Sequence, residues 1–289
     1  IGVSVPAADH GWTAGVVWWA KQAMEMHPEI EWNFATADSP AKQISDIETM
    51  MTKGIDGLVV LATESAPLTP TAKAVHERNI YLVNVDRGFL EPVADLFIEG
   101  DNEAFGRKSA EYIVDKLQGK GNILILEGIP STVNSDRVNA AMEVFKKNPG
   151  IKILGQQSGM WNRQKALEVI QPMLTKNPQI DAIWAQDDDM ALGVEQALKE
   201  AGRDKDVWVL GGAGMKDVVQ RVKNNDPLFP ADITYPPSMI ATGIHFAVAN
   251  LRDGKLEQVK KFMPRHMKLD VELITPENAE DHYFPESVF

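Results

Sequence analysis

IDAIWAQDDDMALG, which spans residues 180–193, combines a buried strand, a polar turn and the start of a helix. Residues 180–184 are almost continuously apolar, which is typical of a strand covered on both faces of a parallel sheet. Asp187, Asp188 and Asp189 follow this run, and acidic residues favour the first turn of a helix. A strand that leads through a short turn into a helix is the repeating unit of an α/β fold.

The same alternation of short apolar runs and helical segments extends along most of the chain. Apolar residues between the runs recur with the 3.6-residue period of a helix. Two stretches share a plan in which Pro28 or Pro149 precedes a strand and Asp56 or Asp181 marks the entry to the next one. This weak repeat predicts two βαβ domains with parallel-sheet cores. The predicted strands are residues 1–5, 30–35, 58–61, 81–85, 96–98, 123–126, 151–154, 180–184, 207–210 and 231–234.

Composition and charge exclude several classes of function. The length of 289 residues suits one large or two medium domains, and 44% hydrophobic residues is ordinary for a globular chain. A formal net charge of −12 argues against a nucleic-acid partner, because phosphate-binding surfaces need clustered Lys and Arg. The absence of cysteine excludes disulfides, thiolate catalysis and Cys-based metal sites. No apolar run approaches the roughly 20 residues that span a bilayer.

Neither a metal nor a cofactor is expected. A calcium loop that begins at Asp187 would need a Glu twelve residues into its register, where Leu198 stands. The glycine-rich stretch 211–214 resembles a dinucleotide fingerprint, but Asp217 occupies the place of the third glycine and no ribose-binding acid follows. These glycines instead indicate a tight turn or a close approach of the backbone to a ligand.

Polar and aromatic residues follow two strands of the first half of the chain, at the strand ends where open α/β sheets bind ligands. Asp9, His10 and Trp12 follow the first strand, and Asp86 with Arg87 follows the fourth. Asp, His and Arg can exchange hydrogen bonds with sugar hydroxyls, and a flat indole can stack on an apolar C–H face. Two structural alternatives stay open: a helix cap with a core tryptophan, and an ion pair that pins a turn.

The second half of the chain repeats this arrangement. Asn134 lies in the polar stretch 131–137 after the strand at 123–126, and Trp161 opens the helix after the next strand. Asp187 follows the strand at 180–184. Helix capping would account for two of the three consecutive aspartates, which leaves at least one for another role.

These features together resemble the type I periplasmic sugar-binding proteins, the ribose-binding-protein-like solute receptors of ABC transporters. The resemblance extends to about Thr275, and its most specific matches are residues 84–87, 100–102 and 185–193. It implies two Rossmann-like lobes joined by a three-strand hinge, with the ligand cleft between them. The crossings would fall near residues 100–103, 234–236 and 264–267. The expected lobes are 1–102 with 236–264, and 103–235 with 265–289; residues 276–289 receive no functional interpretation.

The resemblance also assigns ligand contacts. His10 stands where the family has a ligand-binding Asn, Trp12 and Trp161 stand at stacking aromatics, and Ser135 stands at a ligand-binding Arg. Arg137 matches a neighbouring, more structural arginine. With the residues derived above, the predicted ligand-binding set is Asp9, His10, Trp12, Asp86, Arg87, Asn134, Ser135, Arg137, Trp161, Asp187, Ala213 and Tyr235.

Two departures bear on the ligand. The family's Phe-Asp after the ninth strand is Gly212-Ala213 here, and its hinge glutamine is Tyr235, followed by Pro236 and Pro237. Loss of an acidic hydroxyl acceptor disfavours D-ribose. Another pentose, a hexose or an open-chain sugar alcohol fits better, and Asp187 partly restores the lost charge.

The leading hypothesis is therefore a monomeric, non-enzymatic solute receptor that closes around a neutral monosaccharide or sugar alcohol and presents it to an ABC transporter permease. A periplasmic or other extracytoplasmic location is expected. Because the chain opens within a predicted strand, we expect its secretion signal to be absent from this sequence.

Two alternatives remain. One is the effector domain of a sugar-responsive transcription repressor, which would need DNA-binding helices before Ile1. The other is a sugar-modifying enzyme that uses Asp9, His10 and Asp86 as acid–base groups, although the chain carries no phosphate-cradling motif or nucleophile elbow.

Overall fold

The computed structural model describes residues 1–8, 11–252, 254 and 256–289, and it divides into two compact units. The first unit comprises Ile1–Gly100 and Pro237–Leu269, and the second comprises Asp101–Pro236 and Asp270–Phe289. The chain thus passes between the units three times. The third passage lies at residues 269–270 and not at 264–267, because residues 266–269 pair with a strand of the first unit.

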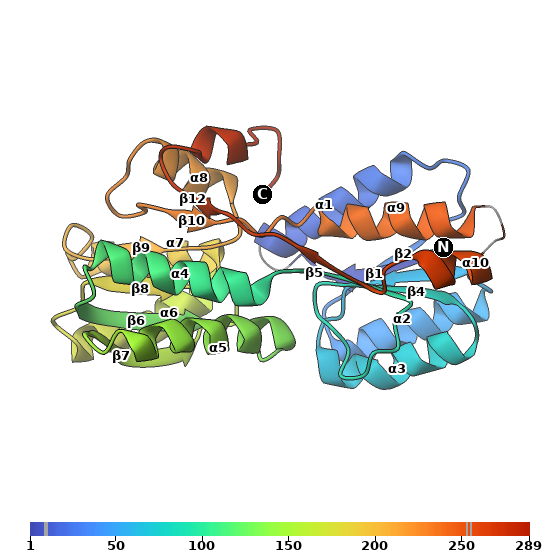
Figure 1. The fold of residues 1–289 in the computed structure, drawn as a ribbon, viewed down its shortest axis with the longest axis horizontal. Helices are drawn as coiled ribbons and strands as arrows, with labels where there is room; N and C mark the ends of the chain where they lie inside the picture. The colour runs from blue at the N-terminus through green and yellow to red at the C-terminus, as the bar shows by residue number, and fades with distance from the viewer. Residues whose placement is uncertain (9–10, 253, 255) are drawn as a thin grey trace. The chain divides into compact units, whose positions relative to one another are not determined.

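A six-stranded parallel sheet forms the centre of the first unit, in the order β11-β5-β4-β3-β1-β2 (Figure 1). Its central strands are mostly apolar and are buried along their whole length, as expected for a sheet with helices on both faces. The strands are β1 Gly2–Pro6, β2 Asn33–Ala37, β3 Gly57–Val60, β4 Tyr81–Val85, β5 Leu96–Gly100 and β11 His266–Leu269.

Two helices cover each face of this sheet. Helices α1 and α9 lie on one face, and α2 and α3 lie on the other, where an apolar cluster that includes Ile47, Leu58 and Leu68 fills the interface. The helices are α1 Gly11–Glu25, α2 Pro40–Thr52, α3 Ser65–Glu77, α9 Met239–Leu251 and the short α10 Leu256–Phe262.

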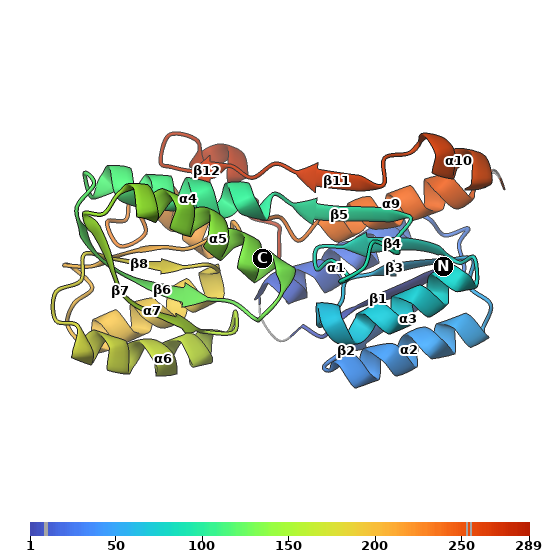
Figure 2. The ribbon, with the colours of Figure 1, turned by 60° about the horizontal axis from the view of Figure 1, so that its bottom comes forward.

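The second unit is built around a four-stranded parallel sheet in the order β7-β6-β8-β9. Helices α4 and α5 cover one face, and α6 and α7 cover the other (Figure 2). The strands are β6 Gly121–Glu127, β7 Ile151–Ser158, β8 Ala182–Ala185 and β9 Trp208–Leu210. The helices are α4 Asn102–Lys116, α5 Thr132–Lys147, α6 Arg163–Lys176, α7 Asp188–Glu200 and α8 Lys216–Lys223.

The end of the chain packs on the second unit. Strand β12 (Leu273–Ile274) pairs antiparallel with β10 (Asp232–Ile233), and the 3-10 helix η1 (Ala279–His282) lies against α8. Ile274 and Ala279 join Val219 and Val222 of α8 in one apolar cluster. The segment 276–289, which had no interpretation at the sequence level, therefore completes the packing of α8.

Each of the runs predicted to be a strand contains a strand, with three differences. The second strand begins at Asn33 and not at residue 30, because residues 27–30 form a turn. Trp32 supports this turn from outside, since its Nε1 donates to the carbonyl of His27 at 3.2 Å. Strand β10 pairs with β12 and is not a member of the parallel sheet. Strands β11 and β12 were not predicted. In the described part of the chain, no helix combines the length and apolar character needed to cross a bilayer.

Candidate ligand-binding site

The first unit places its predicted site residues at the carboxyl edge of its sheet. Trp12 is the second residue of α1, which follows β1, and Asp86 with Arg87 comes directly after β4. All three side chains are buried. Asp9 and His10 lie outside the described residues, so their predicted contacts stay predictions.

The Asp86–Arg87 pair is held against the end of β3. Arg87 Nη1 donates to the carbonyls of Ala62 at 3.2 Å and Thr63 at 2.8 Å, and its Nε lies 3.8 Å from Asp86 Oδ2. Asn84 supports the turn, since its Nδ2 donates to the carbonyl of Arg87 at 3.0 Å. This geometry anchors the guanidinium and presents a buried acidic group beside it. It is compatible both with a hydroxyl acceptor and with the ion pair that was the structural alternative.

In the second unit, four predicted residues gather at one edge of the sheet. Asn134 follows β6, Trp161 follows β7, Asp187 follows β8 and Ala213 follows β9. Because all four strands are parallel neighbours, their carboxyl ends meet at the same edge. All four residues are at least nine-tenths buried.

Helix caps explain how three of these strand ends become sharp turns. Ser131 Oγ accepts from the amide of Asn134 at 3.3 Å, and Asn162 Oδ1 accepts from the amide of Lys165 at 2.9 Å. Asp187 Oδ1 accepts from the amide of Met190 at 3.0 Å. Polar residues with short side chains satisfy the unpaired amides of a first helical turn, so the chain enters each helix at a defined residue.

Trp161 lies against Gly128, the residue after β6. A Cβ atom on Gly128 would fall 1.9 Å from Trp161 Cε2 and 2.0 Å from its Nε1, so only a residue without a side chain leaves room for the ring. Asn134 holds this backbone in place, since its Oδ1 accepts from the Gly128 amide at 2.9 Å. Glu127 Oε2 accepts from Asn134 Nδ2 at 3.1 Å and fixes the orientation of that amide.

Several site residues have backbone conformations that L-residues rarely adopt. Asp86 has φ 66°, Trp161 has φ 51° and Ala213 has φ 114°, and Met160 before Trp161 has φ 58°. The other non-glycine residues of positive φ in the described chain are Asn79, Gln118 and Asn225, which follow the ends of helices α3, α4 and α8. Left-handed residues are common after a helix, but a bulky residue in that region after a strand is strained by about 1–3 kcal/mol. Such strain is concentrated at binding sites.

Arg137 and Tyr235 belong to one buried cluster around Asn102. Arg137 Nε donates to Asn102 Oδ1 at 2.9 Å, and Asn102 Nδ2 donates to the hydroxyl of Tyr235 at 3.1 Å. The Arg137 guanidinium lies 3.8 Å from the ring centre of Phe105 and 4.4 Å from that of Tyr235. Its Nη1 donates to the carbonyl of Gln186, the residue before Asp187. Arg137 therefore supports the positions of Tyr235 and of the β8 end, and its predicted contact with the ligand stays a prediction.

The three consecutive aspartates have three different partners. Asp187 caps α7, Asp189 Oδ1 accepts from Arg163 Nη2 at 2.8 Å, and Asp188 accepts from backbone amides of the β9–α8 loop. Capping thus accounts for one of the three and not for two. Ser135 is exposed on α5, and its hydroxyl donates to the carbonyl of Ser131 at 3.0 Å.

Sequence reasoning missed the residues that orient the others: Glu127, Asn102 and Asp232. Asn102 lies in one of the family-like motifs, and Asp232 interrupts the apolar run 231–234, so both carried a recognisable signal. Glu127 gave none, because its importance depends on the position of Asn134 in space.

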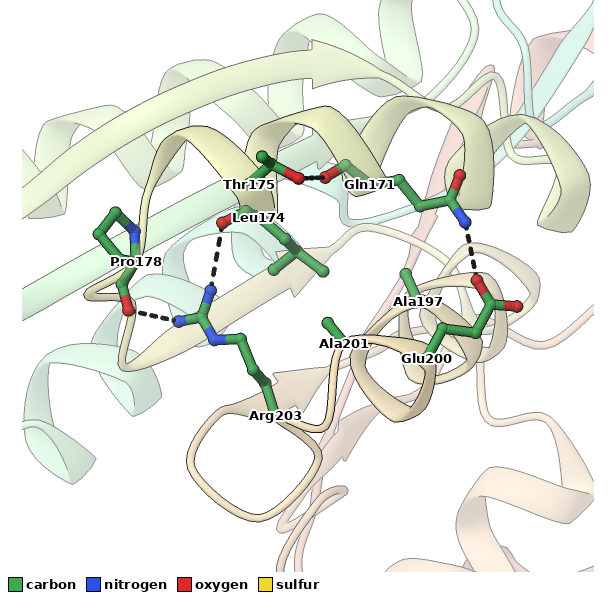
Figure 3. A pocket seen from close by; sticks show the side chains of 8 residues that line it. All are labelled: Gln171, Leu174, Thr175, Pro178, Ala197, Glu200, Ala201 and Arg203. Atoms are coloured by element: carbon green, nitrogen blue, oxygen red, sulfur yellow. Dashed lines mark hydrogen bonds between the residues drawn. The ribbon is translucent and has the colours of Figure 1, made fainter.

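A separate cavity of about 420 Å³ lies between α6 and α7, away from these strand ends (Figure 3). Its lining comes from the carboxyl-terminal halves of the two helices and from the residues that follow them, and Arg203 bridges it by donating to the carbonyls of Leu174 and Pro178. At 1.5 Å per residue, Ala197 lies roughly 15 Å along α7 from Asp187. The cavity is therefore not a part of the candidate site. Among the described residues, no three His, Cys, Asp or Glu side chains are grouped so that they could hold a metal ion.

Comparison with known proteins agrees with this arrangement. The chain is 32% identical over 243 residues to the D-allose-binding periplasmic protein of Escherichia coli, a match that covers 81% of this chain and 77% of that protein. It is 32% identical over 200 residues to the xylitol-binding protein of Mycolicibacterium smegmatis, across 68% of this chain and 57% of that protein's length.

A solved structure extends the likeness to nearly the whole chain. An ABC transporter solute-binding protein from Mycobacterium smegmatis with bound glycerol superposes with a TM-score of 0.89 at 26% identity, over 99% of this chain and 97% of the other. The family model described as "Periplasmic binding protein domain" matches residues 1–256. Membership of that family implies an extracytoplasmic location. The chain belongs to the periplasmic binding proteins, as a type I sugar-binding protein of the ribose-binding group, whose members bind substrates and are not enzymes.

Proposed function

We propose that this protein is the solute-binding component of an ABC importer, and that it captures a neutral monosaccharide or sugar alcohol and delivers it to a membrane permease. The observation that supports this most strongly is the grouping of Asn134, Trp161, Asp187 and Ala213 at the carboxyl edge of one parallel sheet. The edge of the other sheet carries Trp12, Asp86 and Arg87. In this proposal residues at both edges contact the ligand.

The residue types favour an uncharged polyhydroxy ligand of about five or six carbons. Asp86 and Asp187 can accept hydrogen bonds from hydroxyl groups, and Asn134 can exchange them in both directions. Trp12 and Trp161 offer flat apolar faces for the C–H side of a sugar or polyol. The named relatives support the same class, since one is called D-allose-binding and another xylitol-binding.

Delivery would follow from motion at the three chain passages. Ligand contacts on both units favour a closed arrangement, and a permease that recognises this arrangement receives loaded protein selectively. We propose that the protein acts as a monomer and does not bind nucleic acid.

Calorimetric titration with pentoses, hexoses and sugar alcohols tests the proposed function. We expect saturable binding of at least one neutral polyol, and Trp161→Ala should weaken it by about tenfold or more. Trp208→Ala is the matched control. Trp208 begins β9 at the opposite edge of the same sheet, where its ring packs edge-on against Tyr112 with 5.9 Å between the ring centres. Its removal should therefore leave the affinity for the polyol unchanged.

Three results would overturn the proposal. The first is tight binding restricted to a sugar phosphate, an amino acid or a nucleoside. The second is a weakened affinity in Trp208→Ala with normal binding by Trp161→Ala. The third is turnover of a bound sugar, which would restore the enzyme alternative.

A further inference from the structure

Two completely buried carboxyl groups, Asp188 and Asp232, lie side by side in the second unit. Both side chains are 0% exposed, although Asp188 starts α7 and Asp232 lies in β10, which are far apart in the sequence. Both side chains bind amides of the same short loop, residues 211–215, and each carboxyl group acts on the pKa of the other. A hydrogen bond between two carboxyl groups requires a proton on one of them, because ionised carboxylates are acceptors only.

Both carboxyl groups also hold the β9–α8 loop, residues 211–215. Asp188 Oδ1 accepts from the amide of Gly212 and its Oδ2 accepts from the amide of Met215, each at 2.8 Å. Asp232 Oδ2 accepts from the amide of Gly214 at 3.2 Å. Three amides of one short loop are thus bound by the two acids.

The loop backbone is shaped for this interaction. A Cβ atom on Gly211 would fall 2.2 Å from Asp188 Oδ1, so a side chain at this position would displace the carboxyl group. Ala213, between the bound amides, has the strained φ of 114°. The strain persists because the hydrogen bonds on either side fix the loop.

The loop connects directly to the candidate site. The amide of Ala213 donates to the carbonyl of Ile233 at 2.7 Å, and the amide of Tyr235 donates to the carbonyl of Ala213 at 3.2 Å. Ala213 and Tyr235, both in the predicted ligand-binding set, are therefore tied to the loop that Asp188 and Asp232 hold.

Among the described residues, none of the charged groups that shift the pKa values of the pair is a cation. The charged group that acts on both acids is Asp187, a third acid, which opposes ionisation. The charged side chains of the surrounding elements have other partners or are exposed: Lys108 donates to the carbonyl of Val271, Lys216 to that of Ser287, Asp189 pairs with Arg163, Glu272 with His282, and Asp217 is exposed. Burial raises the pKa of Asp188 well above its ordinary value and that of Asp232 to about 7.

We propose that Asp188 and Asp232 are positioning residues of the ligand site, which share one proton and through it hold the loop that carries Ala213. The proposal rests on the function proposed above, and it makes ligand binding pH-dependent. Below the shared group's folded pKa the proton is present and the loop is fixed. Above that pKa two adjacent negative charges repel, β10 and the start of α7 move apart, and the loop is released.

The sign of the effect follows from the direction of the shift. A carboxyl group whose pKa is raised in the folded state stabilises that state most below its ordinary pKa, and this stability is lost as pH rises through the folded value, here about 7. Ligand affinity should fall at higher pH than stability, because the ligand-free folded protein loses the proton only above about pH 7, and one linked proton limits the decrease to about tenfold per pH unit.

The test is a pH series from 5.5 to 8.5 with two measurements: calorimetric affinity for the best polyol of the screen, and the melting temperature of the ligand-free protein. We expect affinity to fall by about tenfold between pH 7 and 8.5, whereas the melting temperature of the ligand-free protein should fall between pH 5.5 and about 7 and level off above it. Asp232→Asn supplies a donor to Asp188 that needs no extra proton, so both profiles should become flat. Asp232→Thr, whose hydroxyl donates at every pH, is the second variant if the first does not fold. Asp217→Asn, an exposed acid just after the loop, should keep the wild-type profiles.

A wild-type affinity that is constant over this range, or an Asp232→Asn protein that keeps the wild-type profile, would overturn the proposal. A protein that binds no polyol at any pH would overturn the proposed function instead. In that case the ligand-free melting profiles still decide whether the two acids share a proton.

Discussion

Replacing Gly128 with alanine tests whether the position of Trp161 controls ligand binding. The added methyl group would fall 1.9 Å from Cε2, 2.0 Å from Nε1 and 2.4 Å from Cζ2 of the Trp161 ring. Carbon atoms pack at about 3.5–4.0 Å, so the ring must move by roughly 1.5–2 Å. The rest of the indole is confined by its burial, with only 6% of the residue exposed.

Two separate effects follow from that displacement. Forcing a methyl group into a packed site costs about 1–3 kcal/mol of folding stability. A ring moved by this distance no longer stacks on a ligand, and aromatic stacking contributes about 0.5–1.5 kcal/mol beyond buried area. Because the displaced ring also buries less apolar surface of the ligand, we expect affinity to fall by about tenfold or more.

Calorimetry with the best polyol and a thermal melt of the ligand-free protein measure the two effects independently. Gly155→Ala is the matched control. It lies on β7 of the same unit, where the added methyl group would meet the Cε of Met173 at 2.8 Å, at the mobile end of a flexible side chain. We expect Gly155→Ala to bind normally.

A Gly128→Ala protein with a lowered melting temperature and an unchanged dissociation constant would refute the reasoning. It would mean that Trp161 packs in the fold without contacting the ligand. Equal decreases of affinity in Gly128→Ala and Gly155→Ala would refute it too, because the effect would then not be specific to the ring.

Three further substitutions test other parts of the structure. Asp86→Ala should weaken polyol binding by about a hundredfold, because each charge-assisted hydrogen bond contributes roughly 1.5–3 kcal/mol, whereas a purely structural pair with Arg87 would lower the ligand-free melting temperature and leave calorimetric affinity normal. Tyr235→Phe removes the acceptor of Asn102 Nδ2, which donates to it at 3.1 Å, so the ligand-free protein should lose about 1–3 kcal/mol in urea unfolding; an unchanged midpoint would contradict this. Ile274→Ala truncates a fully buried side chain of the cluster under α8 and should cost about 2–5 kcal/mol in the same assay, and a decrease below that range would show that the chain end contributes little.

The strands and the site edges could be predicted because their patterns are local. A continuous apolar run such as 123–126 is short and is bounded by polar turns, so its period and length indicate a buried strand without reference to the rest of the chain. Residues that follow such runs must lie at the carboxyl edge of a parallel sheet. This places Trp161 and Asp187 correctly at their strand ends from sequence alone.

Strand β11 was missed for the opposite reason. Residues 266–269 alternate between exposed and partly buried positions at the edge of the sheet, and their place there depends on pairing with β5, which lies more than 160 residues earlier in the sequence. β12 is only two residues long and is defined by its pairing with β10. Neither has enough apolar pattern of its own to indicate a strand.

The supporting contacts of the site could not be predicted from the residue types. Nothing in the sequence pairs Asp188 with Asp232, and a buried acid next to another acid contradicts the usual expectation that charges are solvated. The left-handed backbone of Trp161 is equally hidden, since glycine or asparagine is the usual signal for that conformation. These features depend on tertiary packing, which overrides local preference.

The three chain passages have a practical consequence for making fragments of this protein. Neither unit is one continuous stretch of polypeptide, so a single cut in the chain cannot release either unit complete and separate from the other. In the second unit, however, the two segments meet: the amide of Thr234 donates to the carbonyl of Glu272 at 2.9 Å, and Asp232 is paired with Ile274. A gene that joins Pro236 to Asp270 through a short flexible linker would therefore encode this unit as a single chain, with its acid pair, its tryptophan and its C-terminal segment in their native order. Such a fragment would suit nuclear magnetic resonance, where the protons of one half-site could be followed directly.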